Sequence, residues 1–406
     1  MQEKIITGID IGNQKIRTVI AILDKNEKKP HIAGVGISPS LGMRKGVVVD
    51  VEEVISNISA SLEDAERMSG IPIHHVFVGV GGTHIQSTFS KGVVAINKKV
   101  ISESDINRVL EAAEAISLPQ NQYRLQTLPK SFSVDDQKNI KNPVGLTGIR
   151  LEIEAHITFG QTQILENLEN CIKNSGVDID DLVPQFLAAS EVVLSRRQKD
   201  LGVALVDIGS DSTSLVVFEE GEILHSCVLQ IGGSHVTNDI AIGLRTSIDS
   251  AEKIKIEYGS SIPAEIKESE MIDLSMISKI DFQKISKKHL AEIIQARYHE
   301  IFSLVRNELR MINRDGMLPS GVILTGSAIK MSGIVDLARE VLKLPVQIGF
   351  PQNISGVDEK IDDPGFATAV GLVSWGSKNN STKYNFSFGF GNFFSKMKSF
   401  FKKLLP

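Results

Sequence analysis

The feature that most constrains the fold is a short motif that occurs twice, about half a chain apart. Residues 8–12 read Gly-Ile-Asp-Ile-Gly and residues 205–209 read Leu-Val-Asp-Ile-Gly, and an apolar run follows each motif. Self-similarity of this kind indicates an internal duplication. The repeat therefore predicts two related α/β halves, each opening with a strand, a glycine turn and a second strand.

Composition places the chain among ordinary globular proteins. Its 406 residues allow two or more domains, and 42% hydrophobic residues supply a core that needs no disulfide or metal. A net charge of -5 argues against a general nucleic-acid binder. The two cysteines, Cys171 and Cys227, are far apart and predict neither a disulfide framework nor a zinc site, which fits a reducing compartment.

Membrane signals are confined to the C-terminal end of the sequence. We see no secretory signal after Met1, and no stretch approaches the roughly eighteen apolar residues of a membrane span. Any contact with a membrane is therefore expected to come from a segment that lies on its surface.

Each Asp-Ile-Gly hairpin is a plausible phosphate-binding loop. Glycine lets the backbone approach an anion closely, turn N–H groups can donate to it, and an aspartate at a strand end can hold Mg²⁺ through water. Lys15 adds positive charge to the first turn. A plain Asp-x-Gly turn is the alternative for either copy alone, and equivalent half-chain positions weaken it. Residues 323–327, Ile-Leu-Thr-Gly-Ser, suit a turn under a purine or ribose, although alone they favour an ordinary strand-to-helix turn.

Residues 392–405, near the C-terminal end, form a basic amphipathic pattern at about 100° per residue. The apolar stripe comprises Phe393, Phe394, Met397, Phe400, Phe401, Leu404 and Leu405. The opposite face carries Lys396, Lys398, Lys402 and Lys403. This pattern is typical of a helix at an anionic membrane surface. Packing on a partner protein or on the chain's own core are the alternatives, and the polar linker before the helix disfavours the core.

Several stretches carry a resemblance to a known family. The most specific are residues 142–159 (NPVGLTGIRLEIEAHITF) and 249–259 (DSAEKIKIEYG), supported by residues 8–15, 231–241, 321–327 and 363–372. With these stretches the chain resembles the FtsA family of bacterial cell-division proteins, within the actin and heat-shock-chaperone ATPase superfamily. The resemblance covers nearly the whole chain.

The resemblance implies an actin-like, two-lobed ATPase fold with duplicated ribonuclease-H-like α/β domains, an inserted small α+β subdomain and a C-terminal amphipathic helix. The implied parts are a first core subdomain (1–83, 161–198, 360–376), an inserted interaction subdomain (84–160), a second core subdomain (199–233, 311–359), an upper subdomain (234–310), a linker (377–391) and the terminal helix (392–406).

The resemblance also implies ATP and Mg²⁺ in the cleft between the lobes. The residues implied to contact ATP are Asp10, Gly12, Asn13, Gln14, Lys15, Asp207, Gly209, Ser210, Gly232, Gly233, Glu252, Lys255, Gly326 and Ser327. Asp10 and Asp207 would hold Mg²⁺ through water, and Gln185 stands where related folds orient the attacking water. Glu252 and Lys255, one helical turn apart, resemble the pair that grips ribose and adenine.

The second loop departs from the superfamily's run of glycines, since it reads Gly-Ser-Asp-Ser-Thr over residues 209–213. Ser210 adds a Cβ atom, and Asp211 is expected to bring negative charge near the phosphates. We therefore predict ATP binding with slow or no hydrolysis.

The implied partners are those of a division adaptor at the cytoplasmic face of the membrane, at the division site. The upper subdomain would bind the C-terminal peptide of the tubulin-like protein FtsZ through Lys288, Arg297 and Glu300. The inserted subdomain would serve self-association into a polymer and contact with later division proteins. Two rivals are a scaffold of type IV pilus assembly and a small-molecule kinase of the same superfamily. The first usually lacks the long linker and basic helix, and the second needs a catalytic aspartate that we cannot identify.

Overall fold

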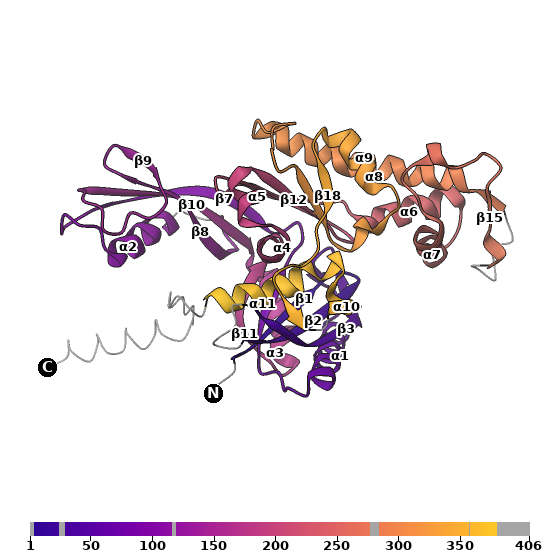
Figure 1. Cartoon of the computed structure of the whole chain (residues 1–406). Helices are drawn as coiled ribbons and strands as arrows, with labels where there is room; N and C mark the ends of the chain where they lie inside the picture. The colour runs from indigo at the N-terminus through magenta and orange to yellow at the C-terminus, as the bar shows by residue number, and fades with distance from the viewer. Residues whose placement is uncertain (1–3, 24–28, 116–118, 277–283, 357, 380–406) are drawn as a thin grey trace.

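A computed structural model describes residues 4–23, 29–115, 119–276, 284–356 and 358–379. Two β-sheets form the centres of two lobes, and a third sheet projects to one side of their junction (Figure 1). In the described ranges, no helix combines the length and the apolar character needed to cross a bilayer.

The first sheet has six strands in the order β11-β6-β1-β2-β3-β19. They are β1 (Lys4–Ile11), β2 (Lys15–Leu23), β3 (His31–Pro39), β6 (His75–Val80), β11 (Asp178–Pro184) and β19 (Ser355–Gly356). Strands β1, β2 and β3 form an antiparallel meander, whereas β6 runs parallel to β1 and β11 parallel to β6. Ile9, Ile16 and Ile20 are fully buried because helices cover both faces of this sheet.

Four helices cover the first sheet. On one face lie α1 (Val51–Ser69) and α3 (Thr162–Asn174), and on the other lie α4 (Gln185–Val193) and α11 (Ala367–Asn379). Helix α1 begins where the Asp50 carboxylate accepts a hydrogen bond from the Glu53 N–H, and it ends at Gly70 in the left-handed region. Its buried side chains recur at helical spacing: Val54, Ile58, Leu62 and Ala65.

The second sheet repeats the topology of the first. Its order is β14-β13-β12-β17-β18, and its strands are β12 (Val203–Ile208), β13 (Thr213–Glu219), β14 (Glu222–Leu229), β17 (Val322–Thr325) and β18 (Val346–Ile348). Strands β12 to β14 are an antiparallel meander, and β17 and β18 continue the sheet in parallel. The order matches β3-β2-β1-β6-β11, so the duplication that the repeated motif predicts is present in the fold.

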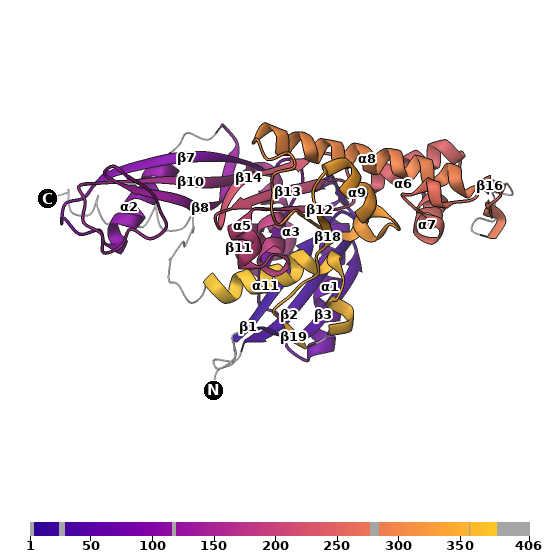
Figure 2. The ribbon, with the colours of Figure 1, turned by 45° about the horizontal axis from the view of Figure 1, so that its top comes forward.

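A four-stranded sheet, in the order β7-β10-β8-β9, projects beyond the second sheet (Figure 2). It consists of β7 (Gln86–Ala95), β8 (Gln122–Val134), β9 (Gln137–Ile140) and β10 (Arg150–Gln161), with α2 (Glu103–Glu114) packed against it. Its small core includes Val109, Leu151 and Ile153. The Ser87 hydroxyl donates to the Ser226 carbonyl at 3.0 Å, which joins this sheet to β14.

The upper part of the second lobe is mostly helical. It contains α6 (Gly233–Leu244), α7 (Ile248–Tyr258), α8 (Lys287–Met311) and the short strands β15 (Met271–Asp273) and β16 (Lys284–Ser286). Helix α8 buries Tyr298 and Phe302, whose rings stack at 6.3 Å. The Tyr298 hydroxyl donates to the Ala328 carbonyl at 2.6 Å, so α8 is fixed to the segment that follows β17.

The remaining elements connect these parts. They are β4 (Met43–Arg44), β5 (Val47–Val48), α5 (Arg196–Leu201), α9 (Ile334–Leu342), α10 (Asp358–Ile361) and the 3-10 helices η1 (Pro263–Glu265), η2 (Leu274–Met276), η3 (Ser327–Lys330) and η4 (Pro364–Phe366). The predicted membrane-binding helix, residues 392–406, lies outside the described residues, as does the linker from residue 380 onward.

Candidate functional site: a cavity between two duplicated loops

The two Asp-Ile-Gly motifs form hairpin loops with the same closure. Between β1 and β2, the Gly12 N–H donates to the Lys15 carbonyl at 3.2 Å. Between β12 and β13, the Gly209 N–H donates to the Ser212 carbonyl at 2.9 Å. In both loops the first glycine and the residue three positions later are therefore held together, and the aspartate stands one residue before the end of the preceding strand.

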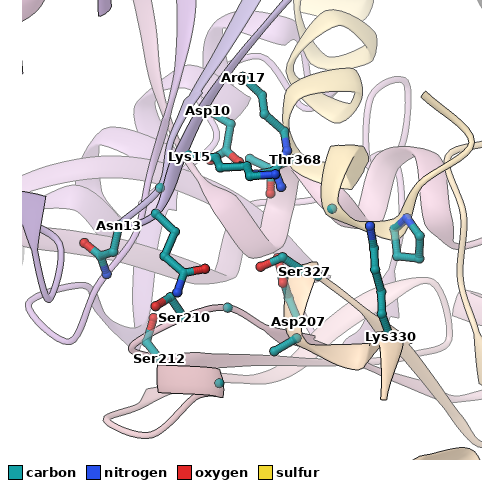
Figure 3. A pocket seen from close by; sticks show the side chains of 18 of the residues that line it. Asp10, Asn13, Lys15, Arg17, Asp207, Ser210, Ser212, Ser327, Lys330 and Thr368 are labelled. Atoms are coloured by element: carbon teal, nitrogen blue, oxygen red, sulfur yellow. The ribbon is translucent and has the colours of Figure 1, made fainter. Parts of the chain in front are cut away.

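Both loops border one cavity of about 480 Å³ between the lobes (Figure 3). Its volume is within the range of small-molecule sites, about 300–1,000 Å³. The lining contains nearly all the site residues predicted from the sequence: Asp10, Gly12, Asn13, Gln14, Lys15, Gln185, Asp207, Gly209, Ser210, Gly233, Glu252, Lys255, Gly326 and Ser327. Gly232 is the predicted ATP contact that is not part of this lining.

Two aspartates from the two lobes face this cavity. The Asp10 side chain accepts a hydrogen bond from Gln185 Nε2 at 2.7 Å, and Arg17 Nη1 lies 4.0 Å from its other oxygen. Burial raises the pKa of Asp10, while Arg17 and Gln185 oppose that shift. Burial and the Asp10 carboxylate together raise the pKa of Asp207 to about 7.

The pair of aspartates fits a divalent cation. Two carboxylates in a poorly solvated cavity repel each other, and each makes the charged form of its neighbour less favourable. A cation between them reverses this effect, and oxygen ligands are the kind that Mg²⁺ prefers. Gly326 leaves room for the arrangement, since a Cβ atom there would lie 2.3 Å from Asp207 Oδ1.

The start of helix α6 is tied to the second loop. The Gly233 N–H donates to the Gly209 carbonyl at 2.9 Å, and the Ser234 N–H donates to the Ser210 carbonyl at 2.8 Å. A Cβ atom at Gly232 would lie 2.6 Å from the Ser210 carbonyl oxygen. The geometry therefore favours a packing role for Gly232, beneath the loop, in place of the predicted phosphate contact.

Asp211 does not line the cavity, contrary to the expectation that it brings negative charge near the phosphates. Its carboxylate accepts hydrogen bonds from the hydroxyls of Ser234, at 2.7 Å, and Ser210, at 3.1 Å. It also accepts one from the Lys45 N–H, at 3.2 Å. These donors hold the side chain away from the cavity, so the second loop presents serines to it and no carboxylate other than Asp207.

The turn at Lys45–Gly46, between β4 and β5, touches both loops. Besides the bond to Asp211, the Gly46 N–H donates to Asn13 Oδ1 at 2.9 Å. Lys45 and Gly46 both have positive φ angles, 53° and 78°. We call residues 45–46 the bridging turn, because it connects the loop of the first lobe to the loop of the second.

Helix α7 contributes an ion pair at the far side of the cavity. Lys255 Nζ lies 2.6 Å from Glu252 Oε2 and donates to the Thr237 hydroxyl at 2.8 Å. The Thr237 hydroxyl also donates to Glu252. The side chains of Glu252 and Lys255 point the same way because the two residues are one helical turn apart, as the sequence spacing predicts.

Sequence reasoning missed part of the lining. Arg17 lies two residues after Lys15 on β2, so strand alternation already places both on one face. Lys330 and Asp363 also line the cavity and form an ion pair at 2.5 Å. They are 33 residues apart, so no local sequence pattern indicates this pair. Other lining residues that the sequence did not single out are Ser212, Gly259, Tyr298, Met331, Phe366 and Thr368.

Comparison with known proteins identifies the family. The family description "Cell division protein FtsA" matches residues 204–371, and "SHS2 domain inserted in FTSA" matches residues 82–159. The cell division protein FtsA of Pseudomonas aeruginosa is 37% identical over 93% of this chain and 90% of its own length. FtsA of Bacillus subtilis is 36% identical over 93% and 84%, and FtsA of Escherichia coli is 30% identical over 93% and 91%.

The chain belongs to the FtsA family. Solved structures agree on the fold: a PilM–PilN type IV pilus biogenesis complex aligns with a TM-score of 0.67 at 16% identity, covering 92% of this chain and 98% of that chain. MreB5 of Spiroplasma citri bound to ADP aligns with a TM-score of 0.54 at 14% identity, covering 93% and 99%. The predicted actin-like fold with an inserted subdomain is confirmed. Because the sequence identities are low, the two structures support the fold and not a function.

The residues predicted to bind an FtsZ peptide do not form a single patch. Arg297 binds Asp239 of α6 through two hydrogen bonds, at 2.5 and 2.8 Å, and Glu300 at 2.6 Å. Lys288 pairs instead with Glu268. At about 100° per residue, Lys288 and Arg297 lie on opposite sides of α8. Lys288 therefore lies on a different surface from Arg297 and Glu300, although the FtsA-family prediction grouped the three residues.

Proposed function

We propose that this chain is an ATP-binding, actin-like division adaptor. It polymerises, tethers FtsZ filaments to the cytoplasmic membrane at the division site, and recruits later division proteins. The observation that carries the nucleotide part is the cavity bounded by two equivalent Asp-Gly hairpins, one from each lobe. Family membership supports the role in division.

In this proposal the residues of the two loops divide the work of holding Mg²⁺-ATP. Backbone N–H groups of the loops and the ammonium of Lys15 would bind the phosphates. Asp10 and Asp207 would hold Mg²⁺, which neutralises phosphate charge. Glu252 and Lys255 would contact the ribose and adenine, with Gly326 and Ser327 forming the turn beneath them. The domain boundaries predicted from the sequence remain part of the proposal.

We expect slow hydrolysis or none. Gln185 is the residue proposed to orient water, and its Nε2 is engaged with Asp10 at 2.7 Å. A side chain held in this way positions the aspartate first, which leaves its second Nε2 hydrogen and its Oε1 atom to orient water. The proposed role of ATP is therefore to close the two lobes on each other and to favour polymerisation.

The FtsZ peptide would bind on the face where α6 and α8 meet. Arg297, Asp239 and Glu300 form a network there, and Ile242, one turn from Asp239 on α6, is 77% exposed. An exposed apolar side chain beside charged groups suits a short peptide with both apolar and charged residues. Lys288, on the other side of α8, would act only as part of a separate contact.

The tail, residues 392–406, would bind anionic lipid. Lysines near an anionic leaflet contribute about 1 kcal/mol each, and buried Phe or Leu side chains about 1.5–3 kcal/mol each. The conformational entropy lost when the segment becomes a helix offsets several kcal/mol of this favourable binding free energy. A single tail would thus bind reversibly, whereas a polymer would bind firmly because many tails engage together.

The adaptor proposal is tested by co-sedimenting FtsZ with anionic liposomes in the presence of ATP and Mg²⁺. The full chain should bring FtsZ down with the liposomes, and a chain that ends at Gly391 should not. A Phe400→Glu variant should lose liposome binding and keep ATP affinity. Equal recruitment of FtsZ by the full and shortened chains would refute the proposal.

A further inference from the structure

A second group of functional side chains lies away from the cavity, between β14 and α8. His225 and Cys227 are two residues apart on β14, and Glu308 comes from α8. One ligand atom of each residue lies within 4.8 Å of the other two. Figure 2 shows α8 running beside the sheet that β14 borders. We call these three residues the β14–α8 cluster.

The distances in the β14–α8 cluster are close to those of a metal site. His225 Nε2 lies 2.8 Å from Glu308 Oε2, and the Cys227 thiol is hydrogen-bonded to Glu308. Ligand atoms around a tetrahedral zinc ion lie about 3.4–3.6 Å apart, as bond lengths of about 2.0–2.3 Å require. Small side-chain rotations, without movement of β14 or α8, would therefore bring the three atoms to coordinating distances.

The cluster is also accessible and chemically suited to a cation. The side chains of His225 and Glu308 are 23% and 17% exposed, so an ion and a water molecule can reach them. A thiolate, an imidazole and a carboxylate together are a ligand set that zinc accepts.

We propose that His225, Cys227 and Glu308 bind a thiophilic divalent cation of the Zn²⁺ class, with water in the fourth position. On binding, the cation replaces the thiol proton of Cys227, which passes to solvent, and the sulfur becomes a thiolate ligand. His225 coordinates as the neutral imidazole through Nε2, with its proton on Nδ1, and Glu308 coordinates through one carboxylate oxygen.

The position of this site gives the cation a mechanical effect. Strand β14 lies at the edge of the second sheet, and its Ser226 is bonded to Ser87 of β7 and to His156 of β10. A cation that ties β14 to α8 therefore stiffens the strand that carries the inserted sheet. The site is independent of the nucleotide cavity, since none of its three residues lines that cavity.

From the sequence alone, the cysteines predict no zinc site, and the structure shows why this expectation misses the cluster. His225 and Cys227 are near each other, but the third ligand lies 83 residues beyond His225. The usual sequence signs of a zinc site, paired Cys-x-x-Cys or His-x-x-x-His spacings, are not present around Cys227. The site follows only from the packing of α8 on the sheet.

The test is a Co²⁺ titration of the reduced, untagged, chelator-treated full chain, followed by visible absorption. We expect a thiolate-to-cobalt charge-transfer band that Zn²⁺ abolishes by competition. Cys227→Ser should remove the band, and His225→Gln or Glu308→Gln should weaken Co²⁺ affinity by at least about tenfold. Cys171→Ser is the matched control, because Cys171 is a free thiol buried on α3 in the core of the first lobe, and it should leave the band unchanged.

Each outcome of the titration decides the proposal. A cooperative thermal unfolding transition, followed by circular dichroism, reports that each variant is folded. No charge-transfer band at Co²⁺ concentrations of tens of micromolar, in folded chain, would leave only a His225–Glu308 hydrogen bond and overturn the proposal. A band that persists in Cys227→Ser would assign the metal to other residues and would overturn it equally.

Discussion

The two loops that face each other across the cavity have the same backbone closure and different side chains. In the first loop, Gly12 is followed by Asn, Gln and Lys15, and in the second, Gly209 is followed by Ser, Asp and Ser212. Both glycines donate to the carbonyl three residues later. Duplication has thus preserved the turn, while the side chains of the two copies have diverged.

The difference assigns separate roles to the two loops. The first loop places the cationic side chain of Lys15 in the cavity, and Arg17, two residues later, also lines it. The second brings no cation, and its Asp211 reaches sideways to Ser234 of α6 and to the Lys45 N–H of the bridging turn. The comparison teaches that one loop supplies charge for binding and the other couples the lobes.

The largest effect is expected from removing the charge of the first loop. Lys15→Ala should weaken ATP affinity by about tenfold to a hundredfold, because hydrogen bonds to charged groups contribute about 1.5–3 kcal/mol. Ser212→Ala, at the equivalent position of the second loop, should change it less than about threefold. Calorimetric titration with ATP and Mg²⁺ measures both. Equal losses in the two variants would mean that the loops share the charge-binding role.

A second prediction concerns pH and the aspartate of the second loop. Because the pKa of Asp207 is about 7, Mg²⁺-dependent ATP affinity should fall roughly tenfold between pH 8 and pH 6. Asp207→Asn should weaken Mg²⁺-dependent binding and remove this pH dependence. A wild-type titration that is flat between these pH values would contradict the raised pKa.

The raised pKa of Asp207 also predicts that removing its charge stabilises the folded chain at high pH. A carboxyl group whose pKa is raised in the folded state favours folding at low pH, and that contribution is lost as pH rises through about 7. Asp207→Asn should therefore raise the melting temperature of the ligand-free chain at pH 8 and have little effect at pH 4. Thermal unfolding followed by circular dichroism measures this, with Asp211→Asn, whose carboxylate accepts three hydrogen bonds, as a control expected to lower the melting temperature.

The smallest effect on ATP affinity is expected from the coupling residue. Asp211→Ala removes the acceptor of the Lys45 N–H, so exchange of that amide should speed up by about tenfold or more. ATP affinity should change less than about threefold. Gln14→Ala, at the equivalent position of the first loop, should leave exchange at Lys45 unaltered. Amide hydrogen exchange resolved by residue distinguishes the two, and a faster Lys45 amide in the control would remove the special role of Asp211.

The parts of the fold and of the site that are predictable from the sequence are those formed by residues close together in the chain. The repeated Asp-Ile-Gly motif predicts the opening hairpin and the loop of each half, because a strand, a glycine turn and a second strand are local in sequence. Glu252 and Lys255 were predictable for the same reason, being one helical turn apart. Residues 120–150 are polar and rich in turn-forming residues, and yet they contain the long strand β8.

What sequence could not supply depends on contacts between distant segments. The direction of the Asp211 side chain is set by Lys45 and Ser234, which lie 166 and 23 residues away. The separation of Lys288 from Arg297 depends on the partners that each finds, Glu268 and Asp239. The β14–α8 cluster likewise forms only because α8 packs on the second sheet.

The most direct test of the account is whether the two loops form one site. A double-mutant cycle of Asp10→Asn and Asp207→Asn, read as Mg²⁺-dependent ATP affinity, measures the coupling between them. If both carboxylates hold the same cation, the double variant should bind little worse than the weaker single variant, with a coupling energy of at least about 1 kcal/mol. Losses that simply add would show that the two halves act independently and would contradict a shared site.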